Sequence, residues 1–174
     1  MRSRLHVDDA PLEALLATYV RDHLAAAAGG AALARRAAGT LDRLDPEDAT
    51  TLSRLAQEIG EERRTLRRCA RALDIRRPRL RELGALIAER LGRVKLNGQL
   101  LGTSSLSPIL EIDLLITAVS GKGRGWRTLA VLAPENVPAD IDLMVLEQRS
   151  IEQRGELEAL QDRLLRRLRD SAED

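Results

Sequence analysis

The chain has 174 residues, of which only 1% are aromatic and none is phenylalanine. Alanine and leucine must then fill the core, and these residues favour helices, whereas sheets depend on β-branched and aromatic residues. This composition excludes an all-β fold. The 28 basic and 27 acidic residues give a net charge of +1, so we do not expect nucleic acid as a partner, because such proteins usually carry a large basic excess.

The cysteine content and the lack of long apolar runs exclude several further classes of protein. Cys69 is the single cysteine, which excludes an internal disulfide and a cysteine-based zinc site. The first residues lack the apolar run of a signal peptide. The longest uncharged stretch, residues 96–110, is too short and polar to cross a membrane. We therefore expect a cytoplasmic protein that does not enter membranes.

The first half of the chain predicts two long helices, which follow an N-terminal arm of residues 1–8. Apolar residues at spacings of three and four predict one buried seam over residues 10–43, running through Leu16, Tyr19 and His23. The sequence Asp45-Pro46 is typical of a helix start and predicts a second helix over residues 46–73. Because the turn between them is so short, the two helices must form an antiparallel hairpin.

The second half predicts one shorter and two long helices. An amphipathic helix is expected over residues 79–95, and long helices over 107–132 and 140–170, capped by Ser107 and Asp140. The whole of residues 9–170 then forms a single domain, and residues 171–174 form a frayed tail. Three glycines predict a kink or a break in the third long helix: Gly121, Gly123 and Gly125.

Spacing also predicts which residues of the last two long helices are buried. In the third helix these are Leu110, Leu114, Thr117, Val119 and Leu129. In the last helix they are Ile141, Met144, Ile151, Leu157, Leu160, Leu164 and Leu168.

Two hairpins separated by the long connection of residues 74–106 resemble the ferritin-like superfamily, including its small bacterial members. This resemblance implies an up-down-down-up four-helix bundle, here with the extra amphipathic helix in its crossover. Di-iron members carry a Glu on two helices and Glu-x-x-His on the other two. His6 and His23 are the only histidines, and neither supplies that motif. We therefore expect no di-iron centre and no cofactor.

Glu62 interrupts the apolar stripe of the second helix. A buried carboxylate needs a partner; His23 is the first choice, and Arg63 or Arg64 can contribute as well. We predict a buried polar pair of Glu62 and His23. The alternative interpretation is a carboxylate-rich metal site, whose ligands would be His23, Glu58, Glu62, Glu111 and Glu147.

The remaining residues that stand out suggest a contact surface and not a catalytic or ligand-binding site. Lys122 and Trp126 are four apart, so they share a helix face and form a possible contact surface. The glycines around Lys122 lack the spacing of a phosphate-binding loop. Cys69 is expected to be buried. The arginines near the ends of the second and last helices lie at opposite ends of such a bundle and cannot form one binding face.

These observations favour a non-enzymatic helical bundle that acts through protein–protein contacts. We expect a homodimer that uses the first helix and the crossover region, together with an unidentified protein partner. The alternative is a metal- or small-ligand-binding bundle with a carboxylate-rich site in its core.

Overall fold

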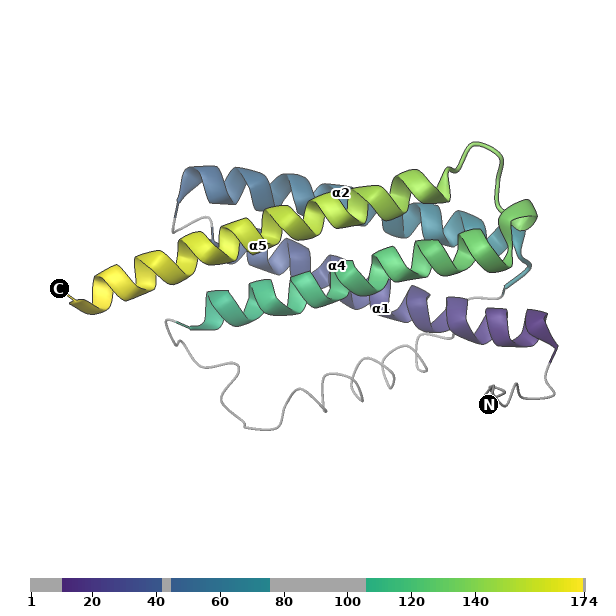
Figure 1. Ribbon diagram of the computed structural model, residues 1–174, viewed down its shortest axis with the longest axis horizontal. Coiled ribbons are helices and arrows are strands. Elements are labelled where there is room, and N and C mark those ends of the chain that lie inside the picture. The colour runs from purple at the N-terminus through teal and green to yellow at the C-terminus, as the bar shows by residue number, and fades with distance from the viewer. Residues whose placement is uncertain (1–10, 42–44, 76–105, 174) are drawn as a thin grey trace, which may run out of the picture.

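The computed structural model describes residues 11–41, 45–75 and 106–173, which form four long α-helices and one short 3-10 helix (Figure 1). This confirms the all-α prediction, and no strand occurs among these residues. The elements are α1 (Leu12–Leu41), α2 (Pro46–Ala72), α4 (Ser107–Leu132), η1 (Pro134–Asn136) and α5 (Leu143–Glu173). The predicted arm 1–8, the predicted helix 79–95 and most of the crossover lie outside the described residues.

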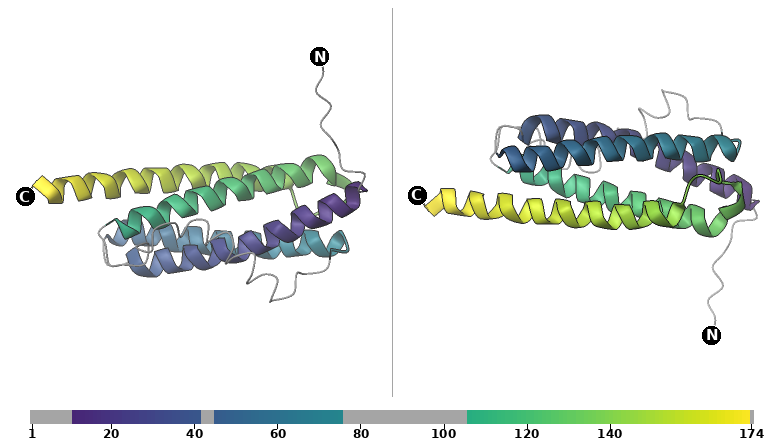
Figure 2. Two further views of the ribbon diagram at one scale, coloured as in Figure 1. Left: turned by 90° about the horizontal axis from the view of Figure 1, so that it is seen from below. Right: turned by 90° about the horizontal axis from the view of Figure 1, so that it is seen from above.

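The helices form two layers, α1 with α2 and α4 with α5 (Figure 2). α1 and α5 run in one direction and α2 and α4 in the other, and α1 also packs along α4 (Figure 1). Two hydrogen bonds between distant residues fix the antiparallel register of α1 and α4: Tyr19 to Thr128 at 3.0 Å and Arg36 to Glu111 at 2.7 Å. None of the helices described here has the length and the apolar run that a transmembrane helix needs.

Side-chain caps explain two of the helix starts. Asp45 accepts a 2.8 Å hydrogen bond from the backbone N–H of Glu47, as expected for the cap of α2, and this bond lowers the pKa of Asp45. At α5 the predicted cap was wrong. Asp142 accepts from the backbone N–H groups of Met144 and Val145 at 2.9 and 3.1 Å, while Asp140 binds Arg68.

The start of α4 also differs from the prediction. Ser107 is its first helical residue, and the capping position is Leu106, without a side-chain capping bond. The expected break is also wrong, since α4 is one continuous helix through its three glycines. Two of them serve close packing: a Cβ on Gly125 would lie 2.6 Å from the His23 ring, and one on Gly123 would lie 3.0 Å from the Ser150 Cβ.

The buried faces of three helices differ from those expected. In α4, Leu110 and Thr117 are exposed; in α5, Met144 and Ile151 are exposed. In α1 the buried stripe includes Val20 in place of the half-buried Tyr19 and His23. The buried apolar residues are Leu16, Val20, Leu24, Ala25, Ala31, Ala34 and Ala37 in α1, Ile109, Ile112, Leu115, Val119, Trp126 and Leu129 in α4, and Leu143, Leu146, Leu157, Leu160 and Leu164 in α5.

Two apolar clusters fill the bundle, and a polar layer separates them. In α2, one cluster contains Leu52 and Leu55 and the other contains Leu66 and Cys69, with Glu62 between them. α1, which the predicted homodimer would use, buries Ala25, Ala31, Ala34 and Ala37 within the chain, because it lies against both α2 and α4.

Candidate functional site

The polar layer consists of one side chain from each of three helices. Glu62 of α2 and Gln153 of α5 are each only 1% exposed, and Lys122 of α4 reaches both. Lys122 Nζ donates to Glu62 Oε2 and to Gln153 Oε1. Gln153 Nε2 in turn donates to Glu62 Oε1 at 3.1 Å and to Glu58 Oε2 at 2.9 Å. These bonds link the three side chains to one another and to Glu58.

Charge pairing offsets the cost of burying this layer. Burial lowers the pKa of Lys122, and the neighbouring Glu62 carboxylate opposes that shift. At Glu58, burial raises the pKa, but hydrogen bonds from Gln153 and Arg54 outweigh it and leave the pKa below its usual value. An opposite charge in hydrogen-bond contact is the arrangement in which a buried ammonium remains favourable.

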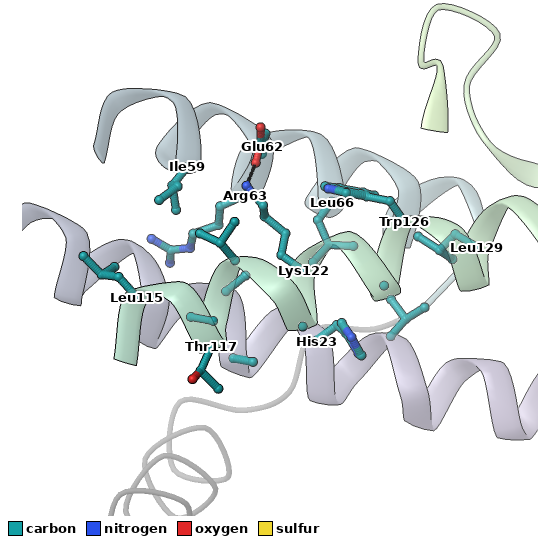
Figure 3. Close-up of a pocket in the computed structure, with 18 of the residues that line it drawn as sticks. His23, Ile59, Glu62, Arg63, Leu66, Leu115, Thr117, Lys122, Trp126 and Leu129 are labelled. Carbon is teal, nitrogen blue, oxygen red and sulfur yellow. Dashed lines mark hydrogen bonds and ion pairs between the residues drawn. The ribbon is translucent and has the colours of Figure 1, made fainter. Parts of the chain in front are cut away.

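The partner of Glu62 is therefore not the one predicted. His23 Nδ1 lies 3.1 Å from the Tyr19 carbonyl oxygen, and the two rings pack with their centroids 4.2 Å apart. The imidazole lies against Gly125, where a Cβ would collide with it. Lys122 takes the expected place of His23 because its long side chain crosses the bundle from α4 to α2 (Figure 3).

The predicted contact surface of Lys122 and Trp126 is also corrected. The Lys122 side chain is 15% exposed and Trp126 is 2% exposed, so both belong to the interior. They lie on the same stripe of α4 as Leu115, Val119 and Leu129. That stripe faces α1 and α2 rather than solvent.

A cavity of about 370 Å³ lies between α1, α2 and α4, next to the polar layer (Figure 3). Most of its lining is aliphatic or glycine, and its polar members include Tyr19, His23, the Lys122–Glu62 pair and Arg63. Some lining positions, such as Ala26, Thr117 and Gly121, are exposed, so the cavity reaches the surface. The remaining lining residues are Val20, Ala27, Gly30, Ile59, Leu66, Leu115, Ala118, Val119, Gly125, Trp126 and Leu129.

Two polar groups of the lining lack a complementary partner within the described part of the chain. The indole N–H of Trp126 is buried and has no hydrogen-bond acceptor. The guanidinium of half-buried Arg63 forms no ion pair, and its pKa is lowered by burial and then by the charges of Arg67 and Arg35. The sequence predicted Arg63 only as a partner of Glu62. Whether a carboxylate lies near the guanidinium depends on the neighbouring helices, so the sequence of α2 alone cannot show it.

The residues of the alternative metal site do not converge. Glu58 and Glu62 meet at Gln153, but Glu111 pairs with Arg36 at 2.7 Å and Glu147 lies 3.8 Å from Arg127. In the described residues no group of three His, Cys, Asp or Glu side chains is arranged to hold a metal ion.

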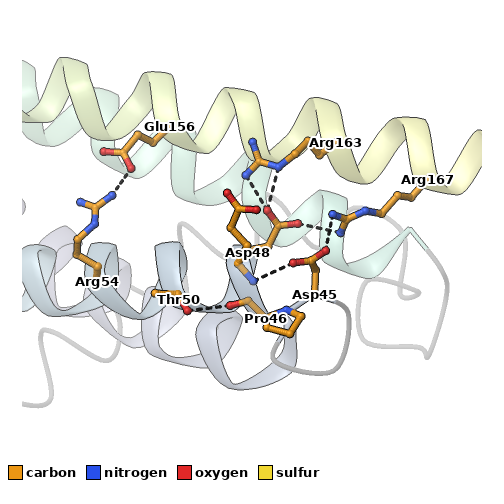
Figure 4. A network of polar contacts seen from close by, with 9 residues as sticks. Asp45, Pro46, Asp48, Thr50, Arg54, Glu156, Arg163 and Arg167 are labelled. Carbon is orange, nitrogen blue, oxygen red and sulfur yellow. Dashed lines mark hydrogen bonds and ion pairs between the residues drawn. The ribbon is translucent and has the colours of Figure 1, made fainter.

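A second polar network joins the start of α2 to the last turns of α5 (Figure 4). Asp48, which is buried, accepts from Arg163 Nη2 at 2.6 Å and from Arg167 Nη1 at 2.8 Å. Arg167 also donates to the capping residue Asp45 at 2.9 Å. Two arginines of the C-terminal group are thus engaged in holding the fold, which a count of charges along α5 does not reveal.

Cys69 is fully buried, as expected, and burial raises the pKa of its thiol to about 11. It is a core residue without a lowered pKa.

We compared the chain with protein-family models, with curated proteins and with solved structures, and none of the three comparisons gives a match. The resemblance to ferritin-like bundles therefore rests on the order, length and direction of the helices alone.

Proposed function

We propose that this protein is a non-enzymatic, small-ligand-binding helical bundle of the ferritin-like, up-down-down-up type. The observation that carries the proposal is the cavity of about 370 Å³ with its largely apolar lining. Ligand sites in proteins are typically apolar concavities of about 300–1,000 Å³ with a few placed polar groups. Helix direction supports the topology, because α2 and α4 run the same way and need a crossover between them (Figure 1).

The chemistry of the lining favours binding over catalysis. Most of the lining is aliphatic or glycine, and Glu62, Lys122 and Gln153 are already bonded to one another. The indole ring of Trp126 adds a large apolar surface to the lining. The ligand site is therefore an apolar cavity, and not the carboxylate-rich metal site that the sequence offered as an alternative.

The test uses Trp126, the only tryptophan of the chain, as its reporter. We expect the small fluorescent dye 1-naphthol, which matches the volume of the cavity, to bind the native protein and change the emission of Trp126. Ala27→Phe should abolish this binding by filling the cavity, since Ala27 lines it. The matched control is Ala159→Phe, at an exposed position of α5. Equal dye binding by both variants, with native circular dichroism, would contradict a ligand site in this cavity.

Protein–protein contact remains a prediction beside this proposal, and so does the homodimer. Light scattering at micromolar concentration should give twice the chain mass of 19.2 kDa. A mass near 19.2 kDa would exclude the dimer without affecting the ligand site.

A further inference from the structure

Arg63 gives the cavity an unbalanced positive charge. Its side chain extends from α2 into the space between the helices, away from the Lys122–Glu62 pair (Figure 3). Arg63 is half-buried, so its guanidinium is available to pair with an anion that enters the cavity. No carboxylate in the described part of the chain forms an ion pair with it.

The groups near Arg63 increase this imbalance. Arg67 and Arg35 both lower its pKa through their charges, so the nearby field is positive on the α2 side and on the α1 side. By contrast, Lys122 and Glu62 together are neutral. Apart from His23, the charged lining residues sum to one positive charge, which matches a ligand with a single negative charge.

Arginine is well suited to hold such a group. Its planar guanidinium can donate two parallel hydrogen bonds to one carboxylate, and these charge-assisted bonds strengthen where water is scarce. The aliphatic walls formed by Ile59, Leu66 and Leu115 cannot solvate an anion, whereas Arg63 supplies a cation that no carboxylate of the described residues pairs with.

The size of the cavity limits the rest of the ligand. At about 30 Å³ for each water-sized group, a cavity of this volume holds on the order of twelve non-hydrogen atoms. A saturated carboxylate of about ten carbons fills that space with an apolar chain and one charged end.

We propose that the cavity binds a medium-chain monocarboxylate, whose carboxylate pairs with Arg63 and whose chain lies along the aliphatic walls toward Trp126. This inference rests on the proposed function, since it assigns a ligand class to the same cavity.

The experiment compares decanoate with decan-1-ol, which has the same chain but no charge. Titration followed by Trp126 emission, and repeated by calorimetry, is carried out on the full chain and on Arg63→Gln and Arg64→Gln. Arg64 is the matched control because it is adjacent, exposed and near Glu61. We expect Arg63→Gln to weaken decanoate binding at least tenfold and to leave decan-1-ol binding unchanged. Arg64→Gln should bind both probes like the native chain.

The possible results distinguish an error in the ligand class from an error in the binding site. If both probes bind and Arg63→Gln weakens neither, or if only decan-1-ol binds, the carboxylate assignment is wrong while the cavity remains a binding site. If neither probe binds to any of the proteins, the proposed function itself fails, as it would if another segment of the chain filled the cavity. Binding of decan-1-ol by Arg63→Gln also shows that this variant is folded.

Discussion

At the scale of single residues, the central polar layer depends on complete pairing. Glu62, Lys122 and Gln153 come from three helices, so each fixes the position of a different helix relative to the other two. Buried ionic groups of this kind add little net stability but penalise alternative packings, because a shifted register would leave a charge unpaired.

Glu62→Ala should lower the free energy of unfolding by roughly 3–5 kcal/mol, because it leaves the Lys122 ammonium buried without its counter-charge. The double variant Glu62→Leu/Lys122→Met should recover most of that loss, since apolar replacement of a buried pair is often neutral or stabilising. Urea unfolding of the three proteins measures both effects. If the double variant is as unstable as Glu62→Ala, then the ion pair itself stabilises the fold, and the loss in Glu62→Ala does not come from the unpaired ammonium.

Cys69 should make stability depend on pH in the alkaline range. Its pKa is about 11 in the folded chain against 9.0 for the ordinary thiol. Below pH 9 both states keep the proton. Between pH 9 and 11 the unfolded chain loses it first, so the free energy of unfolding falls as the pH rises.

Between pH 9 and 11, the free energy of unfolding should fall by about 2–3 kcal/mol more in the native chain than in Cys69→Ala. This value follows from 1.36 kcal/mol for each unit of pKa. Urea unfolding at intervals from pH 8 to 11 measures this difference. Parallel pH profiles of the two proteins would show that the thiol is not desolvated in the fold.

At the scale of the elements, glycine has two different roles in the long helices. Gly125 accommodates the His23 ring, whereas Gly155 has nothing within 4 Å of the place where a Cβ would be. Both lie inside helices, where replacing glycine by alanine removes an entropic penalty of up to about 1 kcal/mol. Only at Gly155 is that gain free of a steric cost.

We expect Gly155→Ala to raise the free energy of unfolding by about 0.5–1 kcal/mol. Gly125→Ala should show no gain or a loss of about 1 kcal/mol, since the His23 ring must move away from Tyr19. Adding His23→Ala should restore the gain at position 125. Thermal unfolding of the series gives these values, and a gain from Gly125→Ala alone would show that the ring moves at no cost.

At the scale of the whole molecule, the network around Asp48 joins the two layers at one end. It connects the first turn of α2 with the last turns of α5 (Figure 4). The carboxylate also lies at a helix N-terminus, where the helix dipole favours negative charge. Its two arginine partners are partly exposed, which weakens the electrostatic gain.

Asp48→Ala should therefore lower the free energy of unfolding by roughly 2–4 kcal/mol, because it removes several charge-assisted hydrogen bonds from a buried acceptor. The control is Asp170→Ala, which removes only an exposed pair with Arg169 and should not change stability measurably. Denaturant unfolding compares the two variants. Equal effects would mean that the Asp48 network does not hold the layers together.

Local features of the sequence determined the helices. Asp45-Pro46 located the start of α2, and the spacing of apolar residues located its buried face, because capping and helical periodicity involve neighbours in the chain. The same spacing identified Glu62 as a charge in the interior, which the structure confirms.

The tertiary structure alone decided the pairing and the cavity. Which residue meets Glu62 depends on the register between α2 and α4, and that register follows from packing along whole helices. α4 has apolar residues on several faces, so only the helices packed around it determine that Leu115 and Trp126 are buried and Leu110 is exposed. The cavity is the space left where side chains of several helices do not fill the bundle. Its volume, and the position of Arg63 away from every carboxylate partner in the described residues, are properties of the assembled helices.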